Sequence, residues 1–292
     1  MKKLAFVTSE EDPTLIADDR LAIAPLAQLG YSVAPLVWDG NQKGIDTFDA
    51  FVFRSCWNYH RKYSAFLSWI RGLEKLARPV FNPIETNVWN LNKKYLLELE
   101  KKGAAIPKTE WLGRGVQLSS AELKSLLSRI GSSKVVVKPA VSLNGHDTFL
   151  FSAGDIAKID DTLRALSPKV DMLIQEYIPE IKTAGEVSLI FFNGKFSHAI
   201  RKMASAQEFR IHEEYGGTRA AFTPGNELIK QAQDIVEMVP SKLLSVRVDL
   251  VERREEASLI ELEIIDPMLF IGYSEGAPAR FAEAIDQAYQ SG

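Results

Sequence analysis

The sequence at residues 258–270 is SLIELEIIDPMLF, an apolar run that carries three acidic residues, Glu261, Glu263 and Asp266. On an extended chain Glu261 and Glu263 point to one face, because successive side chains of a strand alternate between its two faces. Two neighbouring carboxylates repel each other unless a cation lies between them, and Mg²⁺ is a cation that prefers oxygen ligands. The run therefore indicates either a metal-binding strand or an edge strand whose charged face is in water.

A second acidic strand pattern precedes this run. Residues 245–251, SVRVDLV, place Asp249 among β-branched residues, and the polar segment VERREEAS joins the two patterns. Such an arrangement predicts a β-hairpin, which would bring Asp249 beside Glu261. Asp249, Glu261 and Glu263 are thus candidate metal ligands, whereas the role of Asp266 stays open.

Composition bounds the class of protein. The 292 residues suffice for two or three subdomains, and the net charge is −3. Because acids balance the Lys and Arg residues, we expect no nucleic-acid partner. The single Cys56 excludes an internal disulfide and fits a reducing cytoplasm. The first apolar run ends after about five residues, too few for a signal peptide. No run of about 18 apolar residues predicts a membrane span.

Strand patterns alternate with helical patterns in the first part of the chain, which predicts a small parallel sheet covered by helices. The segment RSCWNYH, residues 54–60, follows one of these strands, where such sheets tend to bind ligands. Arg54 is a candidate to clamp a substrate carboxylate, with Trp57 and Tyr59 as an apolar wall. The alternative is aromatic packing beside a surface arginine.

A helix is predicted from Glu85 to Lys102 and another from Ser119 to Ile130, with Ser119 or Ser120 as its N-cap. A strand then carries Lys138, and a small polar loop with an Asn-Gly pair follows at residues 142–147. Such a loop can present backbone N–H groups to phosphate, and a lysine on a strand gives a fixed positive charge. The alternative is a surface lysine beside an ordinary hairpin.

The last part of the chain contains the strongest hairpin signal. GEVSLIFFNGKFSHAIRK, residues 185–202, predicts two strands joined by an Asn-Gly turn at 193–194. The segment EFRIHEEYGGTRAAF, residues 208–222, lacks clean periodicity and predicts a mobile loop. A final helix is predicted from Ala277 to about Ala288.

In this order, the pieces resemble the ATP-grasp superfamily, the ligases that include glutathione synthetase, D-alanine–D-alanine ligase and the RimK-type enzymes. LNKKYLLELEKKGAAIPKT, residues 91–109, resembles the family's first ATP-binding lysine helix, with Lys93 at the place of the lysine. VVVKPAVSLNGHDT, residues 135–148, resembles the second lysine and its phosphate-covering loop, which implicates Lys138.

The strand that runs into Pro179 and the Gly-Glu pair after it resemble the hinge against which adenine lies. The resemblance implies that Gln175 and the backbone near Tyr177 and Ile178 meet the base, and that Glu186 meets the ribose hydroxyls. The two acidic strands resemble the family's metal site, which has an Asp and an E-x-N pattern. Glu263 stands at the place of the Asn and adds one negative charge.

The resemblance implies an α/β (α+β) fold of the ATP-grasp type. An N-terminal parallel α/β subdomain would occupy residues 1–88, and two α+β subdomains, 89–172 and 173–292, would clasp ATP. The segments FRSCWNY, EFRIHEEYGG and IELEIIDPMLF resemble the branch that holds the cyclo-ligase closing the ring of D-cycloserine.

This family's activity would be ATP-dependent ligation of a carboxylate to an amine (or thiol) on small amino-acid-like or peptide-like substrates. An acyl phosphate would form and react, with release of ADP and phosphate. One or two Mg²⁺ ions, or Mn²⁺, would bridge the phosphates, Lys202 would reach the γ-phosphate, and Arg210 would stabilise the oxyanion. The alternatives are a non-catalytic nucleotide sensor or scaffold, and a phosphotransferase. We expect a cytoplasmic monomer or homodimer; the roles of His198 and His212 stay open.

Overall fold

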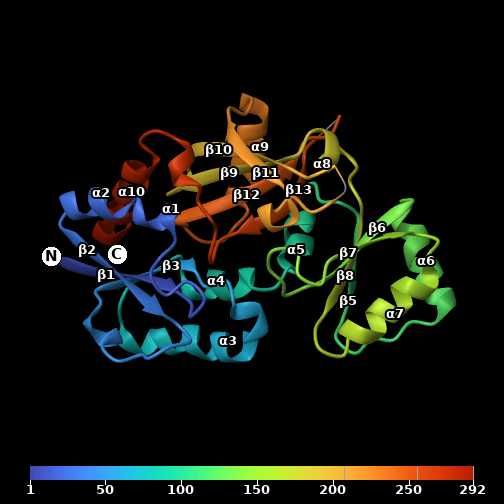
Figure 1. The fold of residues 1–292 in the computed structure, drawn as a ribbon, viewed down its shortest axis with the longest axis horizontal. Coiled ribbons are helices and arrows are strands. Elements are labelled where there is room, and N and C mark those ends of the chain that lie inside the picture. Colours follow the sequence, from blue (N-terminus) through green and yellow to red (C-terminus); the bar gives the residue numbers. More distant parts are fainter. Residues whose placement is uncertain (207, 255, 292) are drawn as a thin grey trace.

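The computed structural model describes residues 1–206, 208–254 and 256–291. Within these residues the chain builds three sheets, each accompanied by helices, and the central sheet forms a lobe at one end of the molecule (Figure 1). None of the helices in the described residues combines the length and the apolar character that crossing a membrane requires.

The N-terminal sheet is parallel, with the strand order β2-β1-β3-β4. Its strands are β1 (Lys2–Thr8), β2 (Tyr31–Val37), β3 (Ala50–Ser55) and β4 (Val80–Phe81). The helices of this part are α1 (Ala17–Arg20), α2 (Ile23–Gln28) and α3 (Tyr63–Gly72). Every residue of β3 is buried, as expected for a strand that is covered on both faces of a parallel sheet. The predicted parallel α/β subdomain is confirmed.

The central sheet is antiparallel, with the order β5-β8-β6-β7. Its strands are β5 (Thr109–Leu112), β6 (Lys134–Pro139), β7 (Phe149–Ser152) and β8 (Met172–Glu176), and its helices are α6 (Ser120–Ile130) and α7 (Ile156–Leu166). Ser119 caps α6 through a capping box with Glu122, as predicted. Because β8 pairs with both β5 and β6, the central unit extends past the predicted boundary at residue 172.

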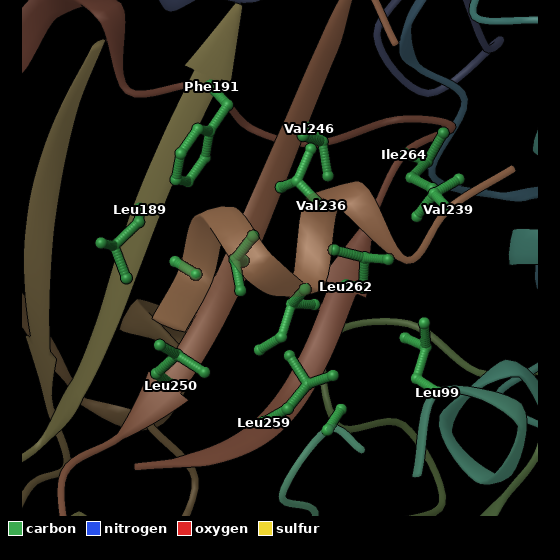
Figure 2. Packing of buried hydrophobic residues seen from close by; sticks show 14 of the residues in the cluster. Leu99, Leu189, Phe191, Val236, Val239, Val246, Leu250, Leu259, Leu262 and Ile264 are labelled. Atoms are coloured by element: carbon green, nitrogen blue, oxygen red, sulfur yellow. The ribbon is translucent and has the colours of Figure 1, made fainter. Parts of the chain in front are cut away.

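The C-terminal sheet has the order β11-β10-β9-β12-β13 and is also antiparallel. Its strands are β9 (Glu186–Phe192), β10 (Lys195–Met203), β11 (Thr218–Phe222), β12 (Ser245–Val251) and β13 (Ser258–Glu263), with helices α8 (Glu180–Thr183) and α9 (Asn226–Glu237). The predicted Asn193-Gly194 turn is confirmed, and both residues have positive φ. Figure 2 shows Val236 of α9 packing with Val246 of β12 and other apolar side chains of this sheet.

The predicted helix over residues 85–102 is interrupted. The structure has two helices instead, α4 (Ile84–Asn90) and α5 (Tyr95–Lys101). Asn90 turns inward at the break, where its side chain donates to Leu262 O at 2.7 Å and accepts from Ile264 N at 2.9 Å. Backbone N–H of Lys93 in the connecting turn donates to Ala140 O at 2.8 Å. These long-range bonds hold Lys93 in a turn rather than on a helix.

One helix packs outside its predicted subdomain, and another lies between the C-terminal sheet and the N-terminal unit. Leu96 and Leu99 of α5 lie in the core formed with the C-terminal sheet, although the predicted boundary assigned them to the central unit. The last helix, α10 (Ala277–Ser291), places Phe281 in one core with Phe6 of β1, so the two ends of the chain lie close together (Figure 1). Both placements follow from burying the apolar face of an amphipathic helix against the nearest uncovered sheet.

Candidate active site

A cavity of about 350 Å³ lies between the central and the C-terminal sheets. Strands β6 and β8 contribute one wall, strands β9 to β13 contribute the other, and Trp57 of the N-terminal unit adds to the lining. The sequence-predicted residues that line this cavity are Trp57, Lys93, Lys138, Gln175, Tyr177, Ile178, Glu186, Lys202, Arg210, Asp249, Glu261 and Glu263.

Three carboxylates meet on the floor of the cavity. Strands β12 and β13 form the predicted antiparallel hairpin, and Asp249 lies directly opposite Glu261 in its register. One oxygen each from Asp249, Glu261 and Glu263 lies within 4.8 Å of the others. An all-oxygen donor set at this spacing fits a hard divalent cation such as Mg²⁺. The group thus has the chemistry of a metal site.

Arg247 is a residue of this site that the sequence reasoning missed. Its guanidinium bonds Asp249 from two nitrogens, Nε at 3.0 Å and Nη2 at 2.9 Å, and Nη2 also pairs with Glu263. The signal was present in the sequence, because Arg247 stands two residues before Asp249 on one strand and so shares its face. Arg247 neutralises the carboxylates from within the sheet.

The acids of the cluster differ in their protonation. Burial opposes ionisation of Asp249, yet the Arg247 and Lys202 charges beside it lower its pKa to about 2. Burial, with repulsion from Glu261 and Asp249, outweighs Arg247 and raises the pKa of Glu263 to about 8. At neutral pH Glu263 therefore holds a proton, which a bound divalent cation would displace.

Two lysines lie above the carboxylates. Lys93 Nζ forms an ion pair with Glu261 at 2.8 Å and donates to Ser142 O at 3.1 Å. Lys138 Nζ donates to the amide oxygen of Gln175 at 3.0 Å. Burial and the nearby charge of Lys93 lower the pKa of Lys138 to about 8. A buried ammonium whose hydrogen-bond partner is a neutral amide is well suited to bind a phosphate, to which it would donate hydrogen bonds.

This depressed pKa predicts proton uptake on nucleotide binding. If Lys138 contacts the phosphates of a nucleotide, their negative charge should raise its pKa from about 8 in the free protein. Above this pKa the side chain of Lys138 is uncharged in the free protein and must take up a proton on binding. Affinity for MgADP should therefore fall as pH increases. Calorimetry at about pH 9 in buffers of different ionisation enthalpy should reveal uptake of up to one proton. Lys138→Met should abolish that uptake, and uptake that persists in this variant would contradict the assignment.

The predicted adenine hinge lies at the end of β8. Gln175 is held on both sides, because its amide nitrogen donates to Thr109 Oγ1 at 2.8 Å while its oxygen accepts from Lys138. The side chain of Gln175 thus orients the lysine. Tyr177 and Ile178, which follow β8, line the cavity beside it and offer apolar surface for a flat base.

Glu186 and Lys202 form a buried pair across the β9–β10 ladder. Lys202 Nζ lies 3.0 Å from Glu186 and 3.6 Å from Asp249. Burial outweighs the attraction of Lys202 and raises the pKa of Glu186 to about 7. Lys202 therefore links the hinge side of the cavity with the carboxylate cluster.

Two loops approach each other over the cavity. A side chain at Gly145, whose φ is +66°, would place its Cβ 3.0 Å from Cδ of Arg210. Arg210 lines the cavity, but its guanidinium pairs with Glu208 at 2.7 Å and lies 3.5 Å from the ring centroid of Tyr215. The close approach at Gly145 leaves little room for a side chain between the loop at residues 142–147 and Arg210.

The three residues of the predicted substrate wall lie in different environments. Arg54 is 1% exposed, pairs with Asp19 at 2.8 Å and donates to Pro267 O at 3.0 Å. The prediction that Arg54 clamps a substrate carboxylate is therefore wrong, because a buried acid already neutralises it. Tyr59 is also an interior residue, stacked on Phe66, and not a wall of the cavity. Trp57 does line the cavity.

Three residues whose roles the sequence left open have distinct environments. His198 is buried, and its Nε2 lies 2.9 Å from Leu269 O, as expected for a packing residue. His212 lines the cavity, and burial lowers its pKa to about 4, so its ring is neutral. Asp266 is buried, its Oδ2 has no hydrogen-bond partner within the described residues, and burial raises its pKa to about 7.

Two antiparallel sheets that enclose two lysines and a carboxylate cluster define an ATP-grasp enzyme. The chain belongs to the family described as prokaryotic glutathione synthetase, ATP-grasp domain, whose model matches residues 107–270. Residues 4–82 match the model described as D-cycloserine synthetase DcsG, N-terminal domain. The protein is thus an ATP-grasp ligase that forms C–N bonds and uses ATP and a divalent metal, not a non-catalytic sensor.

Individual relatives agree with this class. The chain is 24% identical over 294 residues to the cycloserine biosynthesis protein DcsG of Streptomyces lavendulae, covering 97% of each chain. A crystal structure of D-cycloserine synthetase DcsG is similar with a TM-score of 0.88 and 23% identity, over 98% of this chain and 99% of that one. The D-alanine–D-alanine ligase of Bacillus anthracis, complexed with ATP, has a TM-score of 0.71 and 14% identity, with 100% and 98% coverage. The predicted fold and the resemblance to the cycloserine branch are confirmed.

Proposed function

We propose that this ligase activates the carboxylate of a small amino-acid-like or peptide-like substrate as an acyl phosphate and joins it to an amine, releasing ADP and phosphate. The observation that carries the proposal is the convergence of Lys93, Lys138 and the carboxylate cluster on one cavity. Trp57 of the N-terminal unit lines the same cavity, so this unit would contribute to the substrate pocket. A similar protein is named D-cycloserine synthetase, which supports a substrate of amino-acid size.

The lysines and the hinge would position the nucleotide. Tyr177 and Ile178 would contact adenine, Glu186 would accept hydrogen bonds from the ribose, and Lys93 and Lys138 would neutralise phosphate oxygens. Lys202, on rigid strand β10, would hold the γ-phosphate. Phosphoryl transfer demands little beyond such positioning and charge neutralisation.

The carboxylates would complete the neutralisation. Asp249, Glu261 and Glu263 would hold one or two Mg²⁺ ions, which would supply positive charge to neutralise phosphate. Arg247 would then be released from part of its pairing and supply a guanidinium at the reacting carbonyl from a rigid strand. The guanidinium of Arg247 is held by Asp249 and is therefore better positioned to stabilise an oxyanion than that of Arg210. Arg210 lies on a loop and pairs with Glu208, and it would instead help to exclude water.

The proposal predicts ADP release that depends on an added amino acid. The enzyme with MgATP should be screened against D- and L-amino acids and dipeptides in a coupled assay of ADP. A substrate whose carboxylate carries ¹⁸O should transfer one labelled oxygen to the released phosphate, because attack of the amine on the acyl carbon breaks the C–O bond and leaves that oxygen on phosphorus. Unlabelled phosphate would contradict the acyl phosphate. Accumulation of a stable phosphorylated substrate would favour a phosphotransferase instead.

A further inference from the structure

A pair of like charges faces the cavity from neighbouring strands. Lys202 of β10 lies directly opposite Arg219 of β11 in the antiparallel register, and both side chains line the cavity. Like charges at such positions destabilise a sheet, since their Cβ atoms are only about 5 Å apart. Lys202 is compensated by the buried acids Glu186 and Asp249. Among the described residues, the carboxylate that pairs with Arg219 is Glu213, which is more than half exposed.

The partners of Arg219 are weak. Its Nε lies 2.8 Å from Glu213, but the side chain of Glu213 is 56% exposed, and within the described residues Nε makes no hydrogen bond. Its Nη1 donates to Met268 Sδ at 3.0 Å, and a thioether is a poor acceptor. Arg247 and Lys93, by contrast, bond carboxylates of the metal cluster. Arg219 therefore presents a guanidinium whose donor capacity is largely unused.

Aromatic packing fixes this guanidinium. Phe270 is 4% exposed and has a φ of +52°, a left-handed conformation that costs a bulky residue free energy. The ring centroid of Phe270 lies 5.4 Å from Arg219, 5.6 Å from Lys202 and 5.6 Å from Arg247. One ring thus gathers three cations at one side of the cavity, where it stabilises them by cation–π attraction.

This side of the cavity adjoins the N-terminal unit. The loop that carries Met268 and Phe270 follows β13, and its Asp266 O accepts a hydrogen bond from Trp57 Nε1 at 3.2 Å. The hinge residues Tyr177 and Ile178 lie on another element, after β8 of the central sheet. Arg219 is therefore placed next to the proposed γ-phosphate contact Lys202, on the side that faces Trp57.

We propose that Arg219 binds the carboxylate that the enzyme activates. This inference rests on the proposed function and names the residue that positions the phosphoryl acceptor. A carboxylate held by Arg219 on β11 would lie beside a γ-phosphate held by the directly opposite Lys202 on β10, which is the proximity that phosphoryl transfer requires. The bound anion would also relieve the repulsion between the two cations.

The test compares Arg219→Gln and Arg219→Lys with Arg201→Gln. Arg201 precedes Lys202 on β10, so it points to the other face, where it pairs with Glu252 and packs on Phe222. With the panel substrate that gives the fastest ADP release, Arg219→Gln should raise KM about tenfold to a hundredfold, as expected for loss of a charge-assisted hydrogen bond. Arg219→Lys should fall between, and Arg201→Gln should match the parent enzyme.

Measurements of nucleotide affinity distinguish whether Arg219 binds the substrate carboxylate or the γ-phosphate. The Kd values of MgADP and of a magnesium complex of a non-hydrolysable ATP analogue should each change less than about twofold in Arg219→Gln, which also shows that this variant is folded. A selective loss of affinity for the analogue would mean that Arg219 holds the γ-phosphate and would overturn the inference, as would an unchanged KM. If the parent enzyme releases no ADP with any panel member, the proposed function fails and this assignment falls with it.

Discussion

Replacing Glu261 with glutamine is expected to lower kcat for ADP release by about a thousandfold, which corresponds to about 4 kcal/mol. Glu261 lies opposite Asp249 and within metal-ligand distance of it. Glutamine keeps the volume and can still accept the hydrogen bond from Lys93, so the fold and most nucleotide affinity should survive. What is lost is one negative charge that would hold Mg²⁺. Steady-state kinetics over a range of Mg²⁺ concentrations would measure both the loss and a weaker metal dependence.

Two further variants sharpen this result. Glu263→Gln should lose much less activity, because Glu263 stands where the family's pattern has an uncharged Asn, and glutamine keeps an amide oxygen that can serve as a metal ligand. Glu252→Gln removes a half-exposed acid that pairs with Arg201 near the same hairpin and should behave as the parent enzyme. Normal turnover in Glu261→Gln, or equal losses in all three variants, would show that the cluster does not hold the catalytic metal.

Lys138→Met is expected to weaken MgADP binding by about a hundredfold, or about 3 kcal/mol. Lys138 is 8% exposed on strand β6 and donates to the neutral Gln175 amide, so its charge is available to a phosphate. Methionine fills a similar volume without charge, which limits any effect on packing. Calorimetric titration of MgADP at about pH 7, where Lys138 is protonated, would measure the change in Kd.

The matched control is Lys134→Met. Lys134 begins the same strand and is exposed, so its replacement removes one lysine from β6 without touching the cavity. We expect its Kd for MgADP to equal that of the parent enzyme. An unchanged Kd in Lys138→Met, with the protein folded, would show that Lys138 does not meet the phosphates and would remove one half of the proposed nucleotide site.

The elements that were predictable from the sequence are those that local rules govern. Alternation over residues 261–263 set the faces of Glu261 and Glu263, and the Asn193-Gly194 pair set the turn of the β9–β10 hairpin. Ser119 capped α6 for the same kind of reason, because its partner Glu122 is three residues away. In each case the residues that determine the outcome are near one another in the chain.

The predictions that were wrong share one cause, which is contact between residues far apart in the sequence. Arg54 was expected at a substrate because a strand end in a parallel sheet usually faces a ligand, but its partners Asp19 and Pro267 come from opposite ends of the chain. The helix over residues 85–102 broke because Asn90 bonds the backbone around Leu262. No local pattern encodes such bonds, since they depend on which segments the folded core brings together.

The sequence by itself determined the strands, the hairpin that joins Asp249 to Glu261 and the lysine on β6, because side-chain alternation and turn chemistry act over a few residues. Only the tertiary structure decided which charges are compensated. It buried Arg54 against Asp19, set Arg247 among the acids and left Arg219 with weak partners beside Phe270. Charge compensation depends on distance through space and on burial, and both are fixed only when the sheets and the N-terminal unit have packed together.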